Sequence, residues 1–339
     1  MDSISQATLG AAIGETLLGR KVGNKAVLWG AVAGTLPDLD VLAYPLMDQI
    51  AQLGWHRGPS HAFFYLTVAA PVMGWLISRI HRSQTVSWRR WTLLVYLAFI
   101  THVLLDAFTV YGTQWFRPFS DWPVGFDSIS IVDPLYTLPL LISVIVVLFF
   151  RYTSPLRRRI VGIGLMLSTL YLGTTVATKF HVNDVAEVNF DAQGIDAERY
   201  ITTPTLFNTI LWRITAEADD GFYVGYHSLL DKDDDIEFHY LPQNDSLLLP
   251  LAGTDALQRL RWFSRGYYVV SEVDGRIHLA DIRFGTLDAG QPESRRFVFE
   301  WQVEPSAVKP KRGKITKLDF PDMEAGLVLS GLWRRIRGE

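Results

Sequence analysis

The 339-residue sequence contains no cysteine. This absence excludes disulfide bonds and thiolate metal ligands, and it leaves the redox compartment of the protein open. The first residues, Met1 to Gln6, have no basic stretch, and no small-residue cleavage site follows, so we do not expect a cleaved signal peptide. Any membrane insertion therefore depends on internal segments.

Acidic residues are scarce in the first half of the chain. Residues 1–180 contain 14 Lys and Arg but 9 Asp and Glu, whereas residues 181–339 contain 18 and 26. With 49% hydrophobic residues overall, this split predicts two unlike regions. Because an unpaired carboxylate is costly in hydrocarbon, each acidic residue of the apolar half needs a specific partner.

The first half contains a series of apolar runs. They cover residues 3–18, 25–44, 62–80, 91–110, 135–150 and 160–179. The last four approach the roughly 20 residues that a helix needs to cross hydrocarbon, and the first is short enough to be re-entrant. The sequence predicts an all-α polytopic membrane domain of about five to six helices over residues 1–180.

Basic residues cluster in alternate connections between these runs. They are Arg20, Lys21 and Lys25 in the first, Arg79, Arg82, Arg89 and Arg90 in the third, and Arg151, Arg157, Arg158 and Arg159 in the fifth. Lys and Arg accumulate in cytoplasmic loops, so the second and fourth connections and the C-terminal region are expected outside. In a bacterium this means a multi-pass protein of the inner (cytoplasmic) membrane with those parts facing the periplasm.

Six ionisable residues converge on this outer face. Two are the imidazoles of His56 and His61, which bracket a Gly58-Pro59 turn. A continuous helix would place them about 140° apart, but the turn allows His56 to fold back toward His61.

Two carboxylates, Asp38 and Asp40, follow Pro37 at the outer end of the second run. They can both face one ion only if the backbone leaves α-helical geometry there. His102 and Asp106 form an i, i+4 pair on one helix face and need no distortion.

Mixed imidazole and carboxylate ligands suit Zn²⁺, and also Mn²⁺ or Fe, and six ligands would allow one or two ions. The metal ligands expected are Asp38, Asp40, His56, His61, His102 and Asp106, with Asp38, Arg57 and Asp106 as catalytic residues. Arg57 would hold a phosphate or carboxylate group of the substrate. A structural hydrogen-bonded network is the alternative for the cluster, and a snorkelling loop cation is the alternative for Arg57.

The order of these motifs is itself informative. It runs Asp2-Ser3, Leu36-Pro37-Asp38-Leu39-Asp40, His56 to His61, Thr101 to Asp106 and then Tyr111-Gly112-Thr113. It resembles the YdjM-like family of membrane-bound metal-dependent hydrolases over about residues 1–180, which implies a polytopic inner-membrane protein with a divalent-metal hydrolase site. Where many members carry His, this chain has Gln6. A looser similarity to helical zinc phospholipase C and nuclease folds supports phosphoester chemistry.

Beyond residue 180 the composition changes to aromatic and β-branched. Asp274-Gly275 separates two strand-like runs as a hairpin turn would. Apolar and polar residues alternate with period two from Arg276 to Phe284. Arg261-Trp262-Phe263 is a further aromatic run of the kind found in strands. Residues 181–339 are therefore expected to form a soluble, extracytoplasmic β-rich domain. Its C-terminal tail is basic, with Arg334, Arg335 and Arg337.

The favoured function is a metal-dependent hydrolase that cleaves an ester or phosphoester, phospholipase-like, in a membrane lipid or other amphiphile, and we expect no nucleic-acid partner. Aromatic residues between Tyr111 and Pro134 fit the headgroup layer as a lid or an ordinary aromatic belt. Two other classes stay open: an ion-coupled transporter that uses the same buried groups, and a membrane scaffold with a structural polar cluster.

Overall fold

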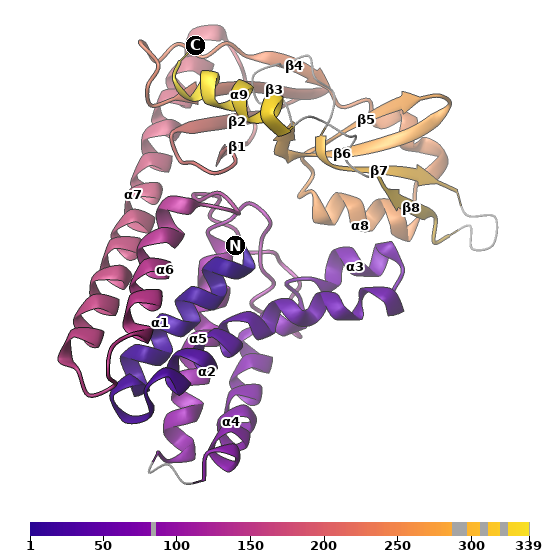
Figure 1. Ribbon diagram of the computed structural model, residues 1–339. Coiled ribbons are helices and arrows are strands. Elements are labelled where there is room, and N and C mark those ends of the chain that lie inside the picture. The colour runs from indigo at the N-terminus through magenta and orange to yellow at the C-terminus, as the bar shows by residue number, and fades with distance from the viewer. Residues whose placement is uncertain (83–85, 287–296, 306–310, 319–324, 339) are drawn as a thin grey trace. The chain divides into compact units, whose positions relative to one another are not determined.

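The computed structural model describes residues 1–82, 86–286, 297–305, 311–318 and 325–338 (Figure 1). The chain divides into two compact units. The first consists of residues 1–43 and 55–176, and the second of residues 44–54 and 177–339. Residues 44–54 are thus an excursion of the chain that packs with the second unit.

The first unit is helical. Its elements are α1 (Ser3–Val22), α2 (Asn24–Thr35), the 3-10 helix η1 (Leu36–Leu46), the 3-10 helix η2 (Pro59–His61), α4 (Phe63–Ile80), α5 (Trp88–Ala107), α6 (Pro134–Leu148) and the first part of α7 (Pro155–Gln193). Four stretches of the described chain are long and apolar enough to cross a membrane: residues 24–46, α4, α5 and α7. The shorter α6 is also apolar. The predicted polytopic helical domain is confirmed.

Helices α1 and α2 lie side by side (Figure 1). Glycines of both helices line their contact. A Cβ atom on Gly10 would lie 2.2 Å from the carbonyl oxygen of Gly30, and one on Gly34 would lie 2.4 Å from that of Gln6. Only residues without a side chain permit this backbone contact, the arrangement common between membrane helices. The close packing brings the carbonyl of Gly34 and the side chain of Gln6 to the face where α5 packs.

One buried ion pair holds the other end of these helices. Arg157 of α7 donates to both carboxylate oxygens of Glu15 in α1, at 2.9 and 2.6 Å, and to the side chain of Asn24 and two backbone carbonyls. Both charged side chains are 1% exposed. Arg157, which the sequence analysis used only as a sign of orientation, therefore links α7 to α1, α2 and α6.

The second unit contains two four-stranded antiparallel sheets. The first is formed by β1 (Tyr200–Pro204), β2 (Leu211–Ala218), β3 (Gly221–Ser228) and β4 (His239–Pro242), and the second by β5 (Tyr268–Val273), β6 (Arg276–Thr286), β7 (Phe297–Glu304) and β8 (Lys314–Lys317), each in sequence order. The β-rich prediction is confirmed, and Asp274 and Gly275, at φ 51° and 71°, form the predicted turn between β5 and β6.

Helices cover one face of each sheet. Trp212 and Ile214 of β2 pack against Val182 and Phe190 in the last part of α7. In the other sheet, Trp301 of β7 meets Phe263, whose ring centroid lies 5.6 Å away. Phe263 ends the helix α8 (Asp255–Phe263), so the strand expected for residues 261–263 is wrong. Its aromatic side chains lie on an amphipathic helix whose N-cap is Thr254.

The remaining elements are short. They are α3 (Gln49–Trp55), the 3-10 helix η3 (Asp245–Leu251) and α9 (Ala325–Ile336). Within the second unit, Asp48 forms an ion pair with Arg312, and the side chain of Gln49 accepts a hydrogen bond from the backbone of Lys317. In the basic tail, Arg335 pairs with Asp231.

Candidate metal centre

Four side chains of the first unit meet around one point. Asp38 comes from η1, His61 from η2, and His102 and Asp106 from α5, and one ligand atom from each lies within 4.8 Å of all the others. The imidazoles of His61 and His102 and the carboxylate of Asp106 are fully buried, whereas the side chain of Asp38 is 14% exposed. Asp38 is therefore the most exposed member of the cluster.

The spacing of these atoms suits a small cation. The Nε2 atom of His61 lies 3.3 Å from Asp38 Oδ1 and 3.2 Å from Asp106 Oδ2, and that of His102 lies 3.5 Å from each. The two Nε2 atoms are 3.1 Å apart. These are five of the six separations among the four ligand atoms, and all four atoms lie within 4.8 Å of one another. A tetrahedron with edges of about 3.3 Å has its centre about 2.0 Å from each corner, the length of a zinc–nitrogen or zinc–oxygen bond.

Hydrogen bonds fix the tautomers of both imidazoles. His102 Nδ1 lies 2.6 Å from the carbonyl oxygen of Gly34, which can only accept, so this nitrogen carries the proton. The Ser60 hydroxyl donates to Asp40 at 2.7 Å, and its oxygen accepts from His61 Nδ1 at 2.9 Å. In the neutral rings both Nε2 lone pairs then point into the cluster.

The donor set therefore fits a metal ion. Two imidazole lone pairs and two carboxylate oxygens face one another, and Asp106 Oδ2 is buried with no hydrogen-bond partner among the described residues. Such a set needs a shared positive charge, because buried acceptors without a donor are costly. These four residues could hold one metal ion.

The change of backbone geometry just before Pro37 decides how Asp38 and Asp40 are used. The chain changes from α to 3-10 geometry at Leu36, as sharing one ion would require. Asp38 nevertheless faces the cluster, while Asp40 accepts from His56 Nδ1 at 2.8 Å and from the Arg57 backbone at 3.2 Å. Asp40 orients His61 through Ser60 instead of joining the four ligand atoms.

His56 lies beside the cluster and outside it. Its ring contacts that of Tyr111, with centroids 5.3 Å apart, and that of His61, at 5.9 Å. Arg57, at φ 55°, makes the turn that the Gly58-Pro59 sequence suggested. Of the six ligands expected from the sequence, the fold brings four together and places Asp40 and His56 as a hydrogen-bonded pair next to them.

Arg57 faces Asp106. Its guanidinium lies 3.1 Å from Asp106 Oδ1 and donates to the carbonyl of Asp106 and the hydroxyl of Thr109, at 3.2 and 2.8 Å. The side-chain amide of Gln6 donates to the same Oδ1 at 2.9 Å, and the Met1 amino group contacts it as well. Two cations and one amide thus contact Oδ1 of Asp106, which leaves Oδ2 for the cluster.

Residues 1–182 match the family model described as YdjM inner membrane protein. The chain belongs to this family. The match contains all four cluster residues and every side chain that orients them. It also supports membrane localisation, in agreement with the apolar helices.

One similar protein comes from Bacillus subtilis (strain 168). It is described as uncharacterized protein YfhP and is 28% identical over 239 residues, covering 66% of this chain and 68% of the relative. No solved structure matches the chain significantly.

The sequence did not identify several groups that shape the centre. Ser60 and the carbonyl of Gly34 orient the imidazoles, and Gln6 and Thr109 hold Asp106 and Arg57. The role of Ser60 could have been inferred from the sequence, because its hydroxyl is adjacent to His61 and neighbouring hydroxyls often hydrogen-bond a ligand. A backbone carbonyl leaves no such signal, because its direction depends on helix packing.

Proposed function

We propose that the protein is a metal-dependent hydrolase that cleaves an ester or phosphoester of a membrane lipid or similar amphiphile. The observation that carries the proposal is the set of four ligand atoms, five of whose six separations are 3.1–3.5 Å, with one buried carboxylate oxygen that has no hydrogen-bond partner among the described residues. A divalent metal held there, zinc by the donor set, would polarise a substrate oxygen and activate a water molecule.

The chain's own groups have distinct roles in this proposal. Asp38, the most exposed of the four, offers Oδ1 to the cluster, and its other carboxylate oxygen would accept the proton of the attacking water. Arg57 balances the charge of Asp106 and fixes its orientation, since its guanidinium is already engaged by that residue and by Thr109. His56 and Asp40 hold Ser60 and His61 in place.

Aromatic side chains near the centre support a lipid substrate. Trp115 packs on Phe63, donates to the carbonyl of Val103, and precedes a run of exposed rings in the same connection. Phe119 is 83% exposed and Trp122 is 66% exposed. Such rings suit the interface between hydrocarbon and water, where they would guide an amphiphile to Asp38.

The test is an incubation of purified protein with a membrane lipid extract, with products identified by mass spectrometry. We expect the wild type to release a product that requires metal, and His61→Ala or Asp106→Ala to release less than about a hundredth as much. His81→Ala is the matched control, because His81 bonds Trp29 and lies outside the cluster. Stoichiometric metal without any product from lipid would contradict the hydrolase and favour metal-coupled transport.

A further inference from the structure

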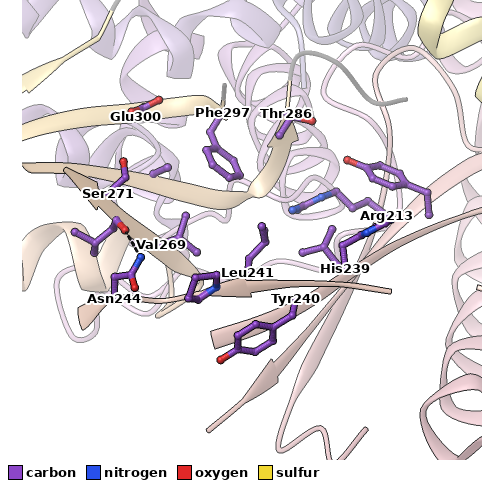
Figure 2. Close-up of a pocket in the computed structure, with 15 residues that line it drawn as sticks. Arg213, His239, Tyr240, Leu241, Asn244, Val269, Ser271, Thr286, Phe297 and Glu300 are labelled. Atoms are coloured by element: carbon purple, nitrogen blue, oxygen red, sulfur yellow. Dashed lines mark hydrogen bonds between the residues drawn. The ribbon is translucent and has the colours of Figure 1, made fainter. Parts of the chain in front are cut away.

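A cavity of about 660 Å³ lies between the two sheets of the second unit (Figure 2). Strands β2, β3 and β4 line one side, and β5, β6 and β7 line the other. The volume falls in the range of about 300–1,000 Å³ that small-molecule sites occupy. The cavity is separate from the metal centre, which belongs to the first unit.

The strand register explains why this space is lined by these residues. Val269, Ala280 and Glu300 are paired across β5, β6 and β7 and share one face of the second sheet. The neighbouring row, which includes Trp301, packs toward α8 on the opposite face. Apolar residues line it from both sheets: Val224, Leu241 and Pro242 from the first, and Val269, Ala280 and Phe297 from the second.

One buried cation interrupts this apolar lining. Arg213 of β2 is 3% exposed, and its side chain projects along the cavity (Figure 2). One terminal nitrogen donates to the carbonyl of Ile282, but Nε has no hydrogen-bond partner among the described residues. A guanidinium donor buried in this way is costly, so it indicates a site for an anionic group.

A glycine makes room for this side chain. Gly285 lies in the irregular end of β6, at φ 75°, and a Cβ there would approach Arg213 Cδ to 3.3 Å. Tyr226 stands directly opposite Arg213 in the register of β2 and β3, so both side chains enter the cavity from the same sheet face. His239 also lines the cavity.

The charges of the cavity select the type of anion. Glu300 lines the same space, and its carboxylate pairs with His278 at 2.9 Å. A phosphate monoester carries about −1.5 to −2 charge at neutral pH, more than one guanidinium balances beside a carboxylate. A carboxylate carries one charge and matches the guanidinium fork in a bidentate manner.

We propose that this cavity binds a single-chain carboxylate amphiphile such as a fatty acid. The head group lies on Arg213, and the chain extends along Leu241, Val269 and Phe297. The proposal does not depend on the hydrolase activity, because it uses no residue of the metal centre.

Photolabelling of the purified full-length protein tests it. The probe is a diazirine analogue of lauric acid, the matched probe is its methyl ester, and labelled peptides are mapped by mass spectrometry. We expect the acid to label strands that line the cavity at least about ten times more strongly than the ester, because only the acid has the charge that Arg213 recognises.

Two variants keep the result decisive. Arg213→Gln removes the cation, and Val269→Trp fills the cavity while it leaves Arg213 in place. Both should reduce cavity labelling about tenfold, whereas Arg276→Gln, at an exposed position in the β5–β6 hairpin, should not. The proposal would be overturned if acid and ester labelled the cavity equally, or if all labels lay in the first unit. It would also be overturned if either cavity variant kept the native melting temperature and was labelled as strongly as the wild type.

Discussion

The Nε2 atoms of His61 and His102 lie 3.1 Å apart. Each ring donates a hydrogen bond from its Nδ1 atom, His61 to the Ser60 hydroxyl and His102 to the Gly34 carbonyl. Two lone pairs at this distance repel unless a cation or a proton lies between them. Since Asp38 and Asp106 add two carboxylate oxygens to the same space, a divalent ion would satisfy the whole set.

We expect purified wild-type protein to contain about one equivalent of divalent metal. His61→Ala and His102→Ala should retain less than a tenth of it, because each removes a ligand atom. His56→Ala should bind metal about 10- to 100-fold more weakly, since it only orients Asp40 and through it His61. Inductively coupled plasma mass spectrometry and chelator competition measure these values, and full metal content in both ligand variants would exclude this centre.

The glycine row predicts a packing defect that reaches the metal centre. A Cβ atom on Gly30 would lie 2.2 Å from the carbonyl of Gly10, so Gly30→Ala should force α1 and α2 apart. The displaced Gly34 carbonyl would no longer orient His102, and both the melting temperature and the metal affinity should fall. Gly173→Ala is the control, because a Cβ there would meet no atom within 4 Å in the described part of the chain, apart from its own neighbouring helix backbone. Equal behaviour of the two variants would be inconsistent with the close contact.

Replacing Arg157 should destabilise the first unit strongly. Arg157→Met leaves the Glu15 carboxylate buried without its partner. We expect the free energy of unfolding to fall by about 3–5 kcal/mol. The double variant Glu15→Gln/Arg157→Met should recover part of this loss, and Arg158→Met, which changes an exposed side chain, should have little effect. Unfolding in denaturant measures the differences, and a mild Arg157→Met phenotype would show that the pair is dispensable.

The second unit should become less stable in mild acid. Burial lowers the pKa of His227 below its ordinary value, although Asp231 and Asp234 act in the opposite direction. As the pH falls through about 6.5, the unfolded chain takes up a proton that the folded chain resists, so stability decreases. His227→Gln should therefore flatten the dependence of the free energy of unfolding on pH between about 7 and 5, by about 1.4 kcal/mol per unit of pKa shift, and the melting temperature should follow. His239→Gln, at a half-exposed position, is the control, and an unchanged slope in His227→Gln would contradict the assignment.

The proposed orientation can be tested because the chain has no cysteine of its own. Single cysteines at the exposed positions Asp235 and Thr153 provide reporters for the C-terminal region and for the connection between α6 and α7. A membrane-impermeant maleimide should label Asp235→Cys in intact spheroplasts and Thr153→Cys only after permeabilisation. The reverse pattern would place the C-terminal region in the cytoplasm.

The sequence by itself determined the helical membrane region, the β-rich region and the candidate ligands. Apolar run length and the Asp274-Gly275 turn are local signals, and local geometry follows from them. The His102 and Asp106 pair was equally local, because helix periodicity alone puts both residues on one face.

Only the tertiary structure decided which ligand candidates meet. Asp38 and Asp40 are two residues apart, yet one faces His61 and His102 while the other bonds His56, because the helix tightens to 3-10 geometry after Thr35. The same is true of Arg213, whose place in a cavity depends on how two sheets pack. Such contacts join segments far apart in the chain, and no periodicity within one segment encodes them.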